Sequence, residues 1–372
     1  MESVYESALA VSLDPMMLSL TVPLLVFAYY WFFQPSAFLY FHNWYWRTQL
    51  GLQVYTVRDG SYNFCYSELG RPSARPSLLF LHAFSANKDM WLPMLRYLPK
   101  SLHIICVDLP GHEGTTRIPT DDYSLQGQAG RVHQFVQALE LHHKFHVVGM
   151  SMGGGVAGVY AATYPEHVCG LTLICPAGLC SAKESCFVKE LRRMEAGIPG
   201  PISLIPESPA EVRRMLELCT FRFKLPQQIL QGMVDVRKDH NAFYLQLLLA
   251  LSSESSRYRL QEVMEAIPVP TQVVWGLHDQ VLDVSAVEEL KRGVRNCRVD
   301  LLENCGHTVT LERPRKSANL IASFLRSLGT LPAYLWLLVA SFSGGVPVPL
   351  MQFSLLPVSW YSFCHNLGRM TG

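Results

Sequence analysis

One short segment constrains the fold of this chain more than any other. Residues 146–165, HVVGMSMGGGVAGVYAATYP, pass from an apolar run through a cluster of glycines into an alanine-rich stretch. At its centre lies Gly149-Met150-Ser151-Met152-Gly153, a GxSxG sequence between a predicted strand and a predicted helix. In that setting the serine occupies a strained turn, and the flanking glycines let strand and helix approach without colliding. The segment therefore predicts a nucleophilic serine, Ser151, in a nucleophile elbow flanked by Gly149 and Gly153.

The rest of the chain predicts the sheet to which this elbow belongs. Apolar runs of strand length alternate with helical or loop segments, which indicates a mostly parallel sheet covered on both faces. An earlier pair of runs predicts a hairpin with Asp59-Gly60 at its turn. The chain is thus expected to form an α/β fold with eight strands flanked by helices. The predicted strands lie within residues 52–57, 62–67, 76–84, 102–110, 144–150, 169–176, 271–276 and 298–307.

A serine hydroxyl is a weak nucleophile unless a base removes its proton, so the hypothesis requires a histidine and an acid. His307 follows the last predicted strand, and Asp279 follows the strand before it. Open α/β sheets place their sites past the carboxyl ends of strands, where both residues are expected. The chain order serine, aspartate, histidine is one of the known orders of a catalytic triad. Asp283 is the alternative acid, and Asp279 is preferred because it lies nearer the strand end.

The negative oxygen of an acyl-transfer intermediate needs hydrogen-bond donors. Met152, the residue after the nucleophile, is expected to supply one backbone N–H. Phe84, the last residue of the run 76–84, where the predicted strand passes into a loop, is expected to supply the other backbone N–H. Because losing such a donor costs about 3 to 4 kcal/mol, this loop matters nearly as much as the triad.

The amino-terminal segment differs in character from the rest. No charged residue lies between Asp14 and Arg47, and residues 16–33 are almost wholly apolar, near the shortest length that spans a bilayer. Aromatic residues follow, and their rings favour the headgroup zone. We expect a short extracytosolic segment over 1–15, a transmembrane signal-anchor helix over 16–36, and a cytosolic catalytic domain, because the basic residues follow the anchor. A cleaved signal peptide is the alternative, although the start is acidic.

Composition excludes several classes of function. The chain has 31 basic and 30 acidic residues, which leaves no charge footprint for nucleic acid. Its ten cysteines include no CxxC pair and fit reduced thiols better than a disulfide framework. The cysteines between 169 and 186, and Cys305 with His307, lack the usual spacing of zinc ligands. No metal, nucleotide, flavin or other cofactor is expected.

A long insertion interrupts the alternating pattern. Residues 177–267 are too long for a simple crossover and contain amphipathic stretches, which predicts a helical cap over the site. The hydrolytic core then consists of residues 50–176 and 268–328. An apolar cap beside a membrane anchor suits a lipid ester substrate taken from the bilayer.

Several motifs carry a resemblance to a known family. The chain resembles the α/β-hydrolase family, and within it membrane-anchored monoacylglycerol lipases, over about residues 15–328. The resemblance implies Ser151, Asp279 and His307 as the triad, and Phe84 and Met152 as the oxyanion donors. The motifs are FLHAFSANKDMW, VDLPGHEGTT, SMGG, FKLPQQILQG, VPTQVVWGLHDQVLD and LLENCGHTVTLERPRK.

The same resemblance implies an activity and a location. The expected reaction is hydrolysis of monoacylglycerols, including 2-arachidonoylglycerol, and of some lysophospholipids. The expected location is an internal membrane, such as that of the late endosome, lysosome or endoplasmic reticulum, or the plasma membrane. A serine hydrolase for other small esters or thioesters, and a weakly active membrane interaction protein with a hydrolase fold, are the alternatives. Protein partners and oligomeric state are left open.

Two features depart from the family pattern. Ala83 stands where the family usually has glycine after histidine, and if that position requires positive φ, alanine costs about 1 kcal/mol and displaces the Phe84 amide. The tail, residues 329–372, has no Asp, Glu, Lys or Arg from Gly329 to Gly368, yet its prolines interrupt every apolar run. An interfacial segment, a variant carboxyl end and a second membrane pass are the alternatives for it.

Overall fold

The computed structural model describes residues 15–329, so the expectations for residues 1–14 and 330–372 lie outside the described part. Its centre is an eight-stranded sheet in the order β1-β2-β4-β3-β5-β6-β7-β8. The strands are β1 Gln53–Asp59, β2 Tyr62–Leu69, β3 Leu78–Leu81, β4 Ile104–Val107, β5 Phe145–Met150, β6 Val168–Ile174, β7 Thr271–Gly276 and β8 Cys297–Leu302.

The pairing confirms the predicted mostly parallel sheet. β1 and β2 form the expected hairpin, with Gly60 at a φ of 56°, and β2 runs antiparallel to β4. From β4 through β3 to β8 all neighbours are parallel. Every residue of β3, β4, β5 and β7 is buried, as continuous apolar strands covered on both faces require. The chain therefore has the α/β-hydrolase fold.

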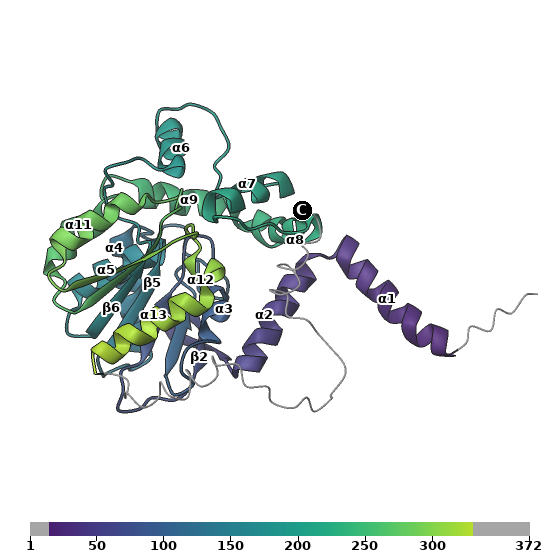
Figure 1. Cartoon of the computed structure of the whole chain (residues 1–372), viewed down its shortest axis with the longest axis horizontal. Coiled ribbons are helices and arrows are strands. Elements are labelled where there is room, and N and C mark those ends of the chain that lie inside the picture. The colour runs from purple at the N-terminus through teal and green to yellow at the C-terminus, as the bar shows by residue number, and fades with distance from the viewer. Residues whose placement is uncertain (1–14, 330–372) are drawn as a thin grey trace, which may run out of the picture.

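Helices cover both faces of the sheet (Figure 1). α4 and α5 pack together on one face, and α3, α12 and α13 lie together on the other. The bounds of these core helices, with α11 beside β8, are α3 Leu92–Leu95, α4 Leu125–Ala138, α5 Met152–Thr163, α11 Val287–Gly293, α12 Val309–Glu312 and α13 Pro314–Ser327.

The insertion between β6 and β7 is helical and lies above the sheet (Figure 1). It buries a small apolar cluster of its own, which includes Val212, Leu230 and Leu248 and also reaches Val281 from the core. The cap is thus packed onto the core as well as within itself. Its helices are α6 Cys186–Glu195, α7 Pro209–Cys219, α8 Gln227–Arg237, α9 Asn241–Ser252 and α10 Arg259–Val263.

Two helices precede the sheet. α1 spans Pro15–Phe33 and projects away from the core, whereas α2 spans Ser36–Leu50 and lies beside α8 (Figure 1). The aromatic stretch expected just beyond the anchor is therefore itself a helix, separated from α1 at Gln34 and Pro35. Among the described residues no single helix is long and apolar enough to cross a membrane. Thr21–Phe33 and Ser36–Leu50, bent by 112°, meet that test as a pair.

Candidate active site

Ser151 lies at the turn between β5 and α5. Its backbone has a φ of 56° and a ψ of −119°, a conformation that L residues rarely adopt, and its N–H donates to the Ile174 carbonyl at 2.9 Å. A Cβ on Gly149 would overlap the Gly153 carbonyl, and a Cβ on Gly153 would overlap the Leu81 carbonyl. Both positions of the GxSxG sequence therefore need glycine because backbone segments meet there.

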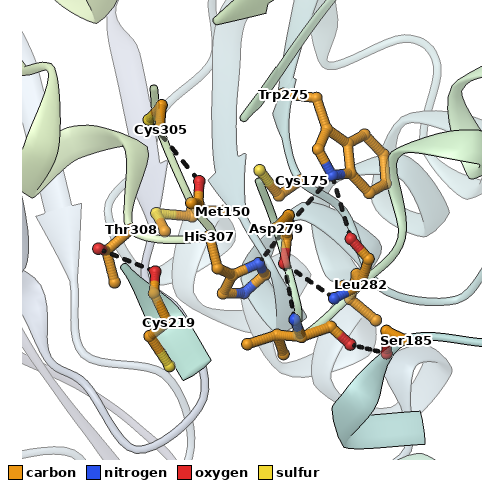
Figure 2. A network of polar contacts seen from close by, with 12 residues as sticks. Met150, Cys175, Ser185, Cys219, Trp275, Asp279, Leu282, Cys305, His307 and Thr308 are labelled. Carbon is orange, nitrogen blue, oxygen red and sulfur yellow. Dashed lines mark hydrogen bonds and ion pairs between the residues drawn. The ribbon is translucent and has the colours of Figure 1, made fainter. Parts of the chain in front are cut away.

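His307 and Asp279 lie side by side in the loops after β8 and β7 (Figure 2). Nδ1 of His307 lies 2.7 Å from Oδ2 of Asp279, and both side chains are buried. The carboxylate is fixed from other directions: Trp275 Nε1 donates to Oδ2 at 3.1 Å, and the N–H groups of Val281 and Leu282 donate to Oδ1 at 2.8 and 2.9 Å. Such an acid can hold the imidazole in one orientation and stabilise its cation.

The alternative acid has a different place. Asp283 precedes a single helical turn over Val284–Ala286, and its carboxylate accepts the N–H of Ser285 at 2.9 Å. The structure therefore brings Asp279 to His307, while Asp283 caps a turn. No hydrogen bond joins the Ser151 hydroxyl to the His307 ring in the described chain, and such contacts often tighten only when substrate binds.

The loop after β3 is held by a buried histidine. His82 Nε2 accepts the N–H of Leu109 at 2.8 Å, so the ring proton resides on Nδ1, which donates to the Ala83 carbonyl at 2.8 Å. Burial lowers the pKa of His82 to about 4, although the bond to Ala83 opposes that shift. A neutral ring of fixed tautomer therefore anchors the residue before Phe84. Across the site, Met152 begins α5, and the first N–H groups of a helix have no partner within it.

Ala83 does not have a positive φ, so alanine at this position, where the family usually has glycine, causes no backbone strain. Within residues 15–329 the positive φ angles of the loop fall on Ser85, at 52°, and not on Ala83. The condition for strain at Ala83 is therefore absent, and Ser85 carries the unusual backbone.

A cap arginine that the sequence did not single out contacts this loop. Arg237, at the end of α8, donates from Nη1 to the Ser85 carbonyl at 3.2 Å and from Nη2 to Ser85 Oγ at 2.8 Å. Nη2 also donates to the Leu204 carbonyl at 2.8 Å, and the guanidinium lies 5.4 Å from the centre of the Tyr244 ring. Burial lowers the pKa of Arg237. One side chain thus ties the cap to the residue after Phe84.

The cap also contacts the loop that carries His307. Thr308 donates its N–H to the Cys219 carbonyl at 3.0 Å, at the end of α7. The carboxylate of Glu312 accepts the N–H of Gly306 at 2.8 Å and that of Phe221 at 2.7 Å. The sequence offered one signal for this role, because Glu312 lies within the motif LLENCGHTVTLERPRK.

One more side chain lies next to the acid and the base. The donor atoms of Cys175, Asp279 and His307 all lie within 4.8 Å of one another, a set of atom types that zinc accepts (Figure 2). Two of these donors already share the short contact between imidazole and carboxylate. Burial raises the pKa of the Cys175 thiol, which keeps it protonated and a poor ligand.

Comparison with known proteins places this geometry in context. The model of a family described as alpha/beta hydrolase fold matches residues 76–314. The chain is 54% identical over 313 residues to the monoacylglycerol lipases ABHD6 of Bos taurus and Homo sapiens, covering 83% of this chain and 93% of each relative.

Solved structures agree with the sequence relatives. The crystal structure of a membrane phospholipase A, described as a bacterial virulence factor, superposes with a TM-score of 0.74 at 30% identity and covers 85% of this chain and 99% of that one. A putative lipase from Acinetobacter baumannii AYE superposes with a TM-score of 0.69 at 27% identity, over 77% of this chain and 95% of that one.

Proposed function

This chain belongs to the α/β-hydrolase family and is a hydrolase, and we propose that it is a membrane-associated serine hydrolase of monoacylglycerols, including 2-arachidonoylglycerol. The observation that carries the proposal is the buried His307–Asp279 pair, at 2.7 Å, on the same sheet edge as the strained Ser151. The choice of substrate rests on the identity of 54% to monoacylglycerol lipases.

In the proposed mechanism Ser151 Oγ attacks the ester carbonyl while His307 takes its proton. Asp279 keeps the imidazole oriented and stabilises the charge that it gains. The N–H groups of Phe84 and Met152 stabilise the oxyanion. His307 then protonates the departing glycerol oxygen, and water, activated by the same histidine, hydrolyses the acyl-enzyme to free fatty acid.

Lysophospholipids form a second proposed substrate class. The phospholipase A that superposes with a TM-score of 0.74 has a name that refers to a phospholipid substrate, which favours this class over other small esters. In both classes the acyl ester is the same group, and only the head group differs.

Membrane association is part of the proposal. Along α1 the side chains of Leu24, Leu25, Phe32 and Phe33 are exposed by 65% or more, which is costly in water for so many adjacent apolar groups. We propose that α1 lies in the bilayer as a signal anchor, with the catalytic domain on the cytosolic side of an internal membrane or the plasma membrane.

Hydrolysis of 2-arachidonoylglycerol by membranes that contain the full chain tests the proposal. The wild type is expected to release arachidonate, and Ser151→Ala at equal expression is expected to lose at least about a thousandfold in rate. A matched control, Ser181→Ala, changes a half-buried serine of the cap whose hydroxyl donates to the nearby Lys183 carbonyl, and should keep full activity. Equal hydrolysis by the wild type and Ser151→Ala would overturn the proposed serine mechanism. If neither protein hydrolyses 2-arachidonoylglycerol, the proposed substrate is wrong.

A further inference from the structure

A cavity of about 730 Å³ lies between α2, the loop after β3 and the cap. Its walls include Leu39 and Trp46 of α2, Met233 of α8, and Ser85. The residues of the proposed triad do not line it. The volume falls within the range of about 300 to 1,000 Å³ that small-molecule sites occupy. The cavity is therefore large enough for a ligand. Ser85, which lines it, is the residue that follows the proposed oxyanion donor Phe84 in the chain.

Most polar groups in its walls already have partners. Arg47 Nη1 lies 2.7 Å from the carboxylate of Asp89. The amide of Asn87 donates to Glu113 at 2.9 Å. A buried charge that is already paired gains little from a polar ligand, so the remaining surface favours hydrocarbon. That surface is formed by Leu216, Phe223, Leu225, Ile229, Val236 and Leu311 with the apolar residues of α2.

The helix α2 forms one side of this cavity. It is held against α8, where a Cβ on Gly232 would come within 2.9 Å of the Pro35 carbonyl group. The rings of Tyr40, Phe41 and Trp44 on this helix are exposed by 51% or more, and Tyr40 and Trp44 also line the cavity. α1, with its exposed apolar side chains, continues from the start of this helix (Figure 1). The same short helix therefore carries exposed aromatic rings and forms part of the wall of the cavity.

We propose that this cavity binds the acyl chain of a single-chain lipid that enters from the bilayer beneath α2. In this role α2 is a specificity-determining wall of the substrate site as well as a link to the anchor. The proposal rests on the proposed function, since that function supplies a lipid ester. In the wall of the cavity Tyr244 packs against Phe84, with ring centroids 5.8 Å apart. These two rings lie where the chain would pass from the cavity to the oxyanion loop.

A photolabelling experiment tests binding without requiring catalysis. The full chain in phosphatidylcholine vesicles is exposed to a monoalkylglycerol ether with a diazirine at the end of its chain, which the enzyme cannot cleave. Peptides from α2 and α8 are expected to carry the label. Met233→Trp fills the cavity from α8 and Leu39→Trp fills it from α2, and each should reduce labelling about tenfold. The control Leu249→Trp adds the same indole to an exposed site on α9 and should leave labelling unchanged.

Kinetics give a second measurement. The ratio of kcat/KM for 2-arachidonoylglycerol to that for a water-soluble acetate ester should fall about tenfold in both filling variants. Reaction of Ser151 with a fluorophosphonate shows that each variant is folded. Label confined to α1 or to other surfaces, or an unchanged substrate ratio, would overturn the cavity proposal. If the wild type binds the ether at α2 and α8 but cleaves no monoacylglycerol, the proposed function fails and the cavity proposal stands.

Discussion

The two sides of the candidate active site are held in place by different kinds of contact. On the triad side, Asp279 is fixed by Trp275, Val281 and Leu282, all within four residues of it in the chain. On the oxyanion side, Ser85 is fixed by Arg237, which is 152 residues away in the cap. The network around Asp279 forms within its own strand and turn. In the oxyanion loop, His82 holds Ala83 to the core, whereas Ser85 has its contacts to Arg237 only when the cap is docked.

This difference has a functional meaning. If the cap moves to admit a lipid, the acid and the elbow keep their local contacts, while the oxyanion loop loses Arg237. The acid and the elbow are therefore expected to be constant through the cycle. The oxyanion loop, and the loop of His307 that Thr308 and Glu312 tie to the cap, are expected to respond to the cap. Substitutions on the two sides should differ accordingly, in size and in the kinetic parameter that they change.

The largest effect is expected on the triad side. Asp279→Asn should lower kcat by about 10⁴-fold, because the amide favours the wrong tautomer of His307 while leaving the shape of the site intact. Asp283→Asn is the matched control, since that carboxylate accepts a backbone N–H of its own turn, and its activity should stay within about threefold of wild type. Hydrolysis rates of purified full-length protein measure both. A larger loss in Asp283→Asn than in Asp279→Asn would exchange the two roles.

The buried histidine of the oxyanion side should make stability depend on pH. His82 has a pKa of about 4 when folded against an ordinary value of 6.5, so between these values the unfolded chain binds a proton that the folded chain does not. The neutral His82 ring therefore contributes fully to the free energy of unfolding above pH 6.5. That contribution is lost as the pH falls from 6.5 towards 4. At pH 5 the loss amounts to about 2 kcal/mol.

Urea unfolding of the full chain in detergent at pH 7 and pH 5 measures this effect. His82→Gln, which keeps an acceptor for Leu109 but does not titrate, should show a smaller change between the two pH values. His146, whose pKa burial also lowers, remains in both proteins and cancels in the comparison. The difference between the two proteins therefore reports His82 together with its effect on His112, whose pKa burial and the adjacent His82 ring both lower. The same pH dependence in wild type and variant would mean that His82 is not the group responsible.

A smaller effect is expected from the link between cap and oxyanion loop. Arg237→Gln should lower kcat about tenfold with little change in KM, because it loosens a group needed in the transition state. Arg237→Lys should recover only part of the rate, since an ammonium cannot bridge Ser85 and Leu204 with a planar fork. Arg213→Gln, at an exposed arginine of α7, is the control. A rise in KM at constant kcat would assign Arg237 to substrate binding instead.

The same contrast explains what the sequence could reveal. The sheet, the hairpin and the elbow follow from apolar runs and from glycines that local geometry demands, so their prediction succeeded. The pairing of Asp279 with His307 was accessible for the same reason, because each residue follows a strand of known position. Arg237 was not accessible, since an arginine in an amphipathic cap helix has no pattern that distinguishes a buried hydrogen-bonding role from an exposed one. The helix α2 was missed because its aromatic residues were interpreted as a membrane-interface belt.

The smallest effect is expected at the position where the sequence raised the greatest doubt. Ala83 is not among the residues with positive φ, so Ala83→Gly relieves no strain and should keep activity within about twofold of wild type, at a stability cost of up to about 1 kcal/mol. Glu140→Gly, at an exposed residue with a φ of 52°, is the opposite case and should stabilise the fold. Hydrolysis rates and unfolding midpoints of both variants provide the test. A large rise in activity for Ala83→Gly would mean that this peptide turns to positive φ when substrate binds, and that the oxyanion loop is remodelled during the reaction even with the cap in place.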